Sequence, residues 1–125
     1  MEYDNIYMNR GDTLDFKFDV EGAEADLSAA FFSCKKDPND DEYVFQKSLG
    51  YGIVKVSTAE DGTRTYSVTV DPSDTMDLEY KTYYYDLQIA FSESQVYTPF
   101  KGLLKIDWDI TRPEEEGGSN KWQEI

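Results

Sequence analysis

The sequence predicts an all-β fold in which seven or eight short strands form a β-sandwich. Three observations lead to this prediction. Several segments alternate apolar and polar residues with a period of two, which is typical of strands with one face in water. Turn-forming residues separate these segments at short intervals. Aromatic residues make up 15% of the 125 residues, which favours a folded β protein over a disordered chain.

Four segments show the clearest alternation and are expected to form the main strands: residues 13–20, 64–70, 81–91 and 102–110. Their apolar side chains, together with those of the weaker strands, should meet in one core. We expect the following residues to be mostly buried: Phe16, Phe18, Phe32, Tyr66, Val68, Tyr85, Leu87, Ile89, Leu104 and Ile106. The alternation of the last segment also places Trp108 in the core.

Weaker alternation predicts shorter strands at residues 5–8, 29–36, 43–48 and 53–57. After the strand that ends at residue 70, Asp71 can cap a single helical turn with Pro72 at its first position. Tyr83 then opens the longest strand, where immunoglobulin-like sandwiches carry a tyrosine corner. We therefore expect an immunoglobulin-like antiparallel β-sandwich. A barrel is the competing architecture, because periodicity alone does not distinguish the two.

Residues 1–112 are expected to form one domain, and residues 113–125 an acidic linker and C-terminal tail. The linker begins at Pro113 and is rich in Glu, Gly and Ser, a composition typical of solvated chain. Trp122 and Ile125 follow it, although Trp is rare in segments that stay disordered. We therefore expect these two side chains to anchor the tail on a partner, with a terminus of no function as the alternative.

The charge balance and the missing residue types restrict the function. The chain has 26 acidic and 12 basic residues, and its net charge of −14 disfavours nucleic-acid binding, which needs clustered Lys and Arg. It has no His, which excludes histidine-based triads and general bases. Cys34 is the single cysteine, and its alternation predicts a buried, unreactive thiol. We expect no enzyme activity, no catalytic residue, no metal and no cofactor.

The N-terminal residues are acidic and lack the apolar segment of a signal peptide. The sequence also has no apolar run of the length that a membrane-spanning helix needs. Together with the single cysteine, these features lead us to expect a chain made in a reducing cytosol, without a membrane partner.

Exposed aromatic residues are the main candidates for a binding surface. Five such side chains are expected to point outward: Phe31, Tyr43, Tyr51, Tyr84 and Tyr97. Tyr combines a large apolar ring with a polar tip, which suits both subunit interfaces and stacking against sugars. We expect these residues, with Trp122 and Ile125, to form an interface. The alternative is that they are scattered surface aromatics.

Two short motifs have both a functional and a structural interpretation. Arg10-Gly11-Asp12 is an integrin-type tripeptide, but Gly11 also suits a turn before the first long strand, which we favour. The acidic segment 37–42 lacks the Gly and Glu positions of an EF-hand loop. We interpret this segment as a solvated turn, with a looser calcium site as the alternative.

The order of several motifs resembles a known family. They are, in order, Arg10-Gly11-Asp12-Thr13, Asp26-Leu27-Ser28, Gln46-Lys47-Ser48, Asp74-Thr75-x-x-Leu78, Tyr83-Tyr84-Tyr85-Asp86-Leu87-Gln88 and Gly102-x-Leu104-x-Ile106. Over about residues 5–112, the chain resembles phage and prophage structural domains of Gram-positive bacteria and is similar to the N-terminal domain of baseplate upper proteins. Lys81-Thr82 stands where that family usually has a glycine.

The resemblance implies a non-enzymatic virion or assembly component that acts through protein–protein contacts. Its partners would be other phage structural proteins of the baseplate, tail or head, or further copies of this chain in a homo-oligomer. Such a protein would be found in the virion after synthesis in the cytoplasm of the host bacterium.

Two other function classes fit parts of the sequence. A carbohydrate-binding sandwich for host-surface glycans is the first, and Asp107 and Asp109 beside Trp108 would suit a sugar site. A polar outer face of the last strand explains the same carboxylates more simply. An acidic phage inhibitor that mimics DNA is the second class, but its carboxylates should lie in rows on one face.

Overall fold

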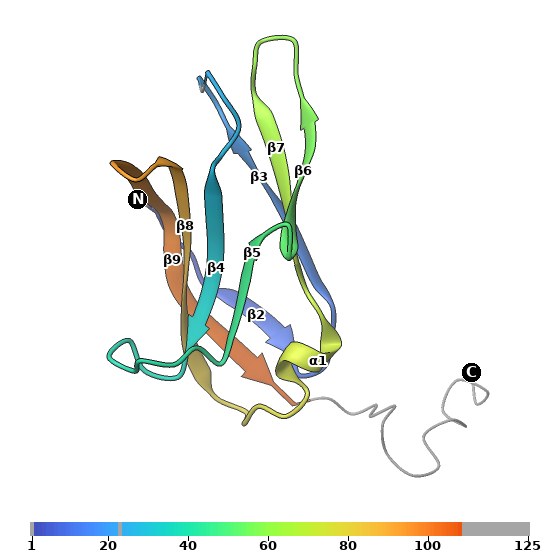
Figure 1. Ribbon diagram of the computed structural model, residues 1–125. Coiled ribbons are helices and arrows are strands. Elements are labelled where there is room, and N and C mark those ends of the chain that lie inside the picture. The colour runs from blue at the N-terminus through green and yellow to red at the C-terminus, as the bar shows by residue number, and fades with distance from the viewer. Residues whose placement is uncertain (1, 23, 109–125) are drawn as a thin grey trace, which may run out of the picture.

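The computed structural model describes residues 2–22 and 24–108, and this part of the chain folds into two packed β-layers (Figure 1). Its elements are β1 (Glu2–Tyr3), β2 (Ile6–Asn9), β3 (Leu14–Val20), β4 (Ala29–Lys35), β5 (Phe45–Leu49), β6 (Gly52–Thr58), β7 (Arg64–Val70), α1 (Pro72–Thr75), β8 (Thr82–Ser92) and β9 (Gln95–Asp107). The prediction of an all-β fold is confirmed. The expected linker and tail, including Trp122 and Ile125, lie outside the described residues, as does Asp109.

Hydrogen-bonded strands follow the order β1-β9-β8-β4-β5-β6-β7-β3, and β2 also pairs with β9. One layer holds β9, β8, β4 and β5, and the other holds β6, β7 and β3 (Figure 1). These orders match the two sheets of an immunoglobulin domain, C′CFG and BED. The layers join where β5 meets β6, so the sheet curls into an almost closed barrel.

The sheet is mixed, whereas the sequence predicted antiparallel strands. β1 and β2 run parallel to β9, and β5 runs parallel to β6 over two residue pairs. Gly50 and Gly52, with φ of 89° and 90°, let the chain cross from one layer to the other within a few residues. Alternation fixes which face of a strand is buried but not the direction of its neighbour, so the sequence carried no signal for the parallel pairs.

The core lies between the layers and follows the predicted alternation. Every residue expected there is buried except Phe16, which is half-buried and packs its ring 5.2 Å from that of Phe32. The expectation for Trp108 is wrong, because its side chain is 62% exposed. β9 ends at Asp107, so the alternation of that strand no longer controls the residue that follows it.

The turn between β7 and β8 contains the predicted helical turn and tyrosine corner. Asp71 is the N-cap of α1, and its backbone N–H donates to the Asp74 carboxylate at 2.7 Å. Tyr83 Oη donates to the backbone oxygen of Glu79 at 3.0 Å, as in a tyrosine corner. Both contacts fix the path of the chain from one layer to the other.

Candidate functional site

A groove of about 770 Å³ lies on the outer face of β4, β8 and β9. Its volume falls within the range of small-molecule sites, about 300–1,000 Å³. The β4–β5 loop contributes Pro38 and Tyr43 to the lining, and Asn5, which lies between β1 and β2, contributes beside β9. The groove therefore has a floor of sheet side chains between two walls from distant parts of the sequence.

The floor follows from the alternation in β8. Alternate residues of this strand are buried in the core, so Tyr84 and Asp86 point outward between them. Strand register then fixes their neighbours. Tyr84 lies between Lys35 of β4 and Leu103 of β9, and Asp86 lies beside Lys101 of β9. Residues from three strands thus form one surface.

Three of the five aromatic residues expected at the surface line this groove. Phe31, Tyr43 and Tyr84 are 36%, 48% and 42% exposed, and all three contribute to the lining. Tyr51 and Tyr97 are also exposed but are not part of it. The structure therefore brings together part of the predicted aromatic patch and places the rest on other surfaces.

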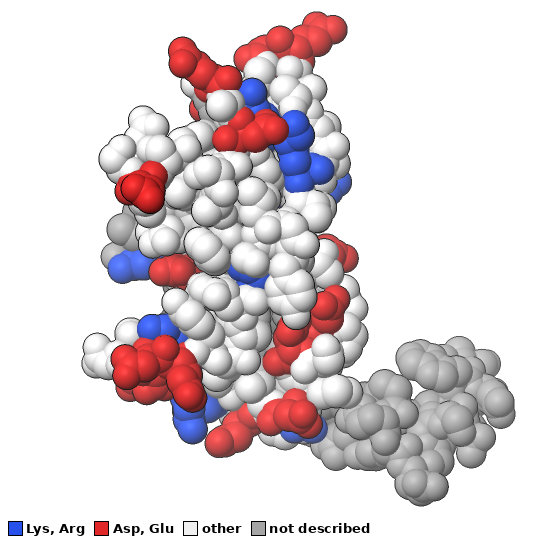
Figure 2. Space-filling model, viewed as in Figure 1, with Lys and Arg blue, Asp and Glu red and all other residues white. Residues whose placement is uncertain are grey.

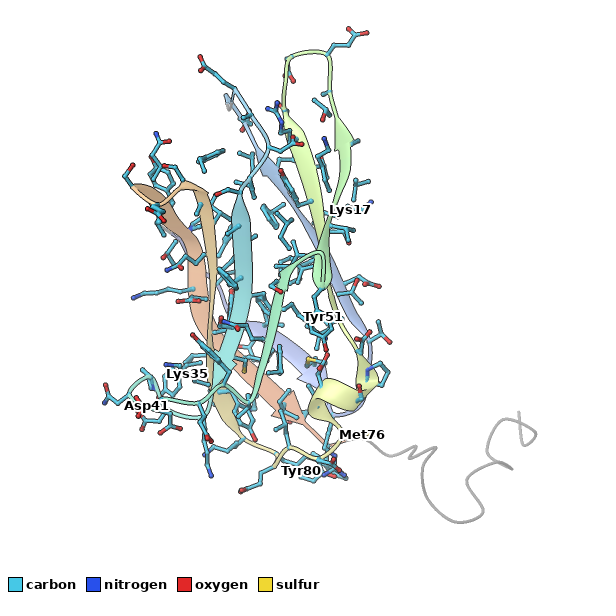
Figure 3. The ribbon with its side chains drawn as sticks, viewed as in Figure 1. Lys17, Lys35, Asp41, Tyr51, Met76 and Tyr80 are labelled. Atoms are coloured by element: carbon cyan, nitrogen blue, oxygen red, sulfur yellow. The ribbon has the colours of Figure 1, made fainter. Side chains whose placement is uncertain are left out.

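Lys35 ties the loop wall to the sheet. Its Nζ lies 5.1 Å from the centroid of the Tyr43 ring, within the range of a cation–π contact. The same Nζ donates to the backbone oxygen of Asp40 at 2.7 Å. Figure 3 shows Lys35 at the end of β4, next to the loop that carries Asp41. One side chain thus holds both the aromatic ring and the loop in place.

Asp86 is the unusual charge of the groove. Its carboxylate is half-buried, and burial raises its pKa above the ordinary value, an effect that attraction to Lys35 and Lys101 only partly offsets. Within residues 2–22 and 24–108, no hydrogen bond or ion pair reaches this carboxylate. Partly desolvated carboxylates are usually hydrogen-bonded, so Asp86 has unused capacity to accept hydrogen bonds.

Gly102 positions the second wall, a role that was not predicted from the sequence. A Cβ at this position would collide with the backbone of Asp4, so only glycine lets the N-terminal segment lie against β9. Tyr85 Oη donates to Asp4 O at 2.6 Å, and Leu103 N–H donates to Asn5 Oδ1 at 3.2 Å. A lone glycine within an alternating strand was the available signal, because it often marks a close backbone approach.

The remaining predicted aromatic residues have other surroundings. Tyr51 lies at the β5–β6 connection, where its ring centroid is 5.3 Å from Lys47 Nζ (Figure 3). Tyr97 packs against Phe91 across the β8–β9 hairpin, with ring centroids 6.3 Å apart. Neither residue approaches the groove, so they do not extend that site.

Lys47, Asp71 and Asp74 form a charged cluster that was not predicted from the sequence. The Lys47 side chain is only 4% exposed, and its Nζ lies 2.7 Å from the Asp74 carboxylate and 3.3 Å from that of Asp71. Burial by itself would lower the pKa of Lys47, but hydrogen bonds and attraction from these two carboxylates outweigh burial and raise it. The cluster attaches α1 to β5, which is a structural role.

The edge of β6 is a third surface of interest. β6 pairs with β5 only at Gly52 and Ile53, so within the described chain the rest of this edge has no neighbouring strand. Val54 and Val56 on this part of β6 are 51% and 49% exposed. An unpaired edge with exposed β-branched residues is a surface on which another strand can add.

The other candidate motifs are better explained by the fold. Gly11 has a φ of 80° in the turn after β2, and its N–H donates to the buried Oγ1 of Thr75 at 2.8 Å. Burial raises the pKa of Cys34 to about 12, which leaves the thiol unreactive at neutral pH. In the part of the chain that the structure describes, no group of three or more His, Cys, Asp or Glu residues could hold a metal ion.

None of the helices in residues 2–22 and 24–108 is long and apolar enough to span a membrane. No protein-family model matches this chain, and no curated protein matches it either. The groove and the edge of β6 are therefore the two surfaces that bear on function.

Proposed function

We propose that this chain is a non-enzymatic phage virion or assembly component that acts through protein–protein contacts. The observation that carries the proposal is the free edge of β6, where Val54 and Val56 are exposed beside backbone groups without a strand neighbour among the described residues. The sequence resemblance to baseplate upper proteins supports the phage assignment.

The β6 edge suits a protein partner for a physical reason. A strand that adds to a sheet edge gains backbone hydrogen bonds along its whole length, and alternate side chains give specificity. Two copies of this chain that pair through the same edge would form a symmetric dimer, the commonest closed assembly. Tyr51 directly precedes β6 and would add exposed aromatic area to such a contact.

The residue chemistry favours binding over catalysis. The chain has no His, and its single thiol is buried with a raised pKa. The distribution of acidic residues also gives little support to a DNA mimic. On the face in Figure 2, red side chains are scattered over the top, the bottom and both sides of the molecule, whereas phosphate mimicry needs ordered rows of carboxylates.

The test combines self-association with virion composition. Sedimentation velocity over a range of concentrations should show oligomers of the wild-type chain. The variant Val54→Lys/Val56→Lys should be monomeric, because charge on a free edge prevents strand addition. Val96→Lys, at an exposed position on β9, is the matched control and should associate like the wild type.

Mass spectrometry of purified virions from the induced host strain should detect the chain at a stoichiometric level. A monomer at every concentration, combined with its absence from virions, would contradict the proposal.

A further inference from the structure

No residue of β6 lines the groove, and the residues that do line it suit a different class of ligand. We infer that the groove binds a neutral saccharide, with the rings of Tyr43 and Tyr84 against the sugar and Asp86 as the hydrogen-bond acceptor that orients it. This inference does not depend on the protein contacts proposed above.

The charges on the floor favour a neutral ligand rich in hydroxyl groups. Asp86 only accepts hydrogen bonds, whereas the ammonium groups of Lys35 and Lys101 only donate them. All three line the groove. A charged ligand of either sign meets a like charge on this floor, Asp86 for an anion and the two lysines for a cation, whereas a neutral ligand meets none. A hydroxyl group both donates and accepts, so a sugar hydroxyl can donate to Asp86 and still accept a hydrogen bond from another group of the floor.

The aromatic residues supply the apolar part of the site. Phe31, Tyr43 and Tyr84 each present a ring that is more than one third exposed. Tyr43 is held by the contact of its ring with Lys35, and the backbone that carries Tyr84 is fixed by the pairing of β8 with strands on both sides. A ring that is already held, like that of Tyr43, loses little conformational entropy on binding.

A ligand would also supply what Asp86 lacks. No group in the described part of the chain donates a hydrogen bond to this half-buried carboxylate. A sugar hydroxyl would form a charge-assisted bond there, which is stronger than a bond between neutral groups. The neighbouring amide of Gln46 already donates to Ser33 Oγ at 2.9 Å, so the floor near Asp86 is ordered.

A peptide strand fits this surface poorly. The floor is the face of β4 and β8, and both strands are already paired on both sides. It therefore offers side chains but no free backbone edge, in contrast to β6. The groove and the edge thus differ in the class of ligand that each can bind.

Isothermal titration calorimetry on the full chain tests the inference. The neutral probes are maltotriose, cellotriose, mannotriose and triacetylchitotriose, and the charged comparators are 3′-sialyllactose and a chitosan trimer. At least one neutral probe should bind at millimolar concentration or below, and it should bind more tightly than either charged comparator. Tyr84→Ala and Asp86→Asn should each weaken that binding about tenfold or more.

Matched controls separate the groove from the rest of the surface. Tyr97→Ala removes an exposed aromatic ring and Asp77→Asn an exposed carboxylate outside the groove, and both should bind like the wild type. Unchanged melting temperatures should show that all variants fold.

Three results would overturn the inference: no binding of any neutral probe, tighter binding of a charged comparator, or unchanged affinity in both groove variants. The saccharide test is independent of the self-association test, because Val54→Lys/Val56→Lys should be monomeric and should still bind the sugar normally. If groove variants instead abolish self-association, the groove is a protein interface and the saccharide inference fails.

Discussion

Lys47 and Asp86 are charged residues of the same layer, and the difference between them separates structure from binding. Lys47 on β5 is buried, and two carboxylates lie within 3.3 Å of its ammonium group. Asp86 on β8 is half-buried on the outer face, and no described residue forms a hydrogen bond or ion pair with it. A buried charge that is fully paired stabilises one conformation, whereas an unpaired one is available to a ligand.

The largest expected effect removes the partners of Lys47. The variant Asp71→Asn/Asp74→Asn keeps the side-chain shapes, and Asn still caps a helix well. It leaves the ammonium buried without a counter-charge, which should cost about 3–5 kcal/mol of unfolding free energy. Urea denaturation measures this loss. Lys47→Met replaces the charge with an apolar chain of similar size and should cost far less. Equal losses in the two variants would show that the pairing of charges does not determine the stability of the fold.

A smaller effect should come from the wall of the groove. Gly102→Ala places a methyl group against the Asp4 backbone and should cost about 1–3 kcal/mol through overpacking. The contact can relax if the N-terminal segment moves away, so the same substitution should cost much less in a chain that lacks residues 1–5. Thermal unfolding of the four combinations measures this coupling. Additive losses would mean that the wall does not depend on Gly102.

The Lys47 cluster should also determine stability at alkaline pH. The pKa of Lys47 in the folded protein lies above its ordinary value of 10.5. Its contribution to stability is therefore complete below pH 10.5 and is lost as the pH rises through the folded-state pKa. Urea titrations above pH 10 should show the wild type losing more stability than Lys47→Met. Parallel pH profiles for the two proteins would contradict this assignment.

Asp86 should have the smallest effect on stability, and its pH dependence has the same sign as that of Lys47 but falls in the acid range. Its pKa is raised in the folded state, so the folded protein gains stability as the pH falls through that pKa. At pH 7, Asp86→Asn should be as stable as the wild type or more stable by about 0.5 kcal/mol. Urea titrations at a series of pH values from 7 down to 4 should show this difference shrinking toward pH 4. A clear loss of stability at pH 7 would mean that Asp86 has a structural partner.

Alternation in the sequence predicted most strands and the core, and the capping pair Asp71-Pro72 predicted the helical turn, because each depends on neighbours along the chain. The first half of β9 was not predicted, since Gln95–Lys101 contains Pro99 and does not alternate. The parallel pairs and the Lys47 cluster depend on which segments meet in space, which local patterns do not encode.

The groove was predictable only in part. The outward positions of Phe31 and Tyr84 follow from alternation. Tyr43 was expected in a short strand over residues 43–48, but it lies in the β4–β5 loop because β5 begins at Phe45. Asp86 gave no sequence signal, because its importance comes from cross-strand neighbours and the absence of a partner in the described chain. Gly102 did give a signal, as a glycine inside a strand, and it was overlooked.

The most direct test of the contrast between Asp86 and Lys47 is a heteronuclear NMR titration of the ¹⁵N-labelled chain with the neutral trisaccharide that binds best. The backbone amides of Tyr84, Asp86 and Leu103 should shift progressively with sugar, whereas those of Lys47, Val54 and Val56 should not move. Shifts centred on β6 or α1, or no shifts at saturating sugar, would contradict the assignment of the unpaired carboxylate to binding and of the paired ammonium to structure.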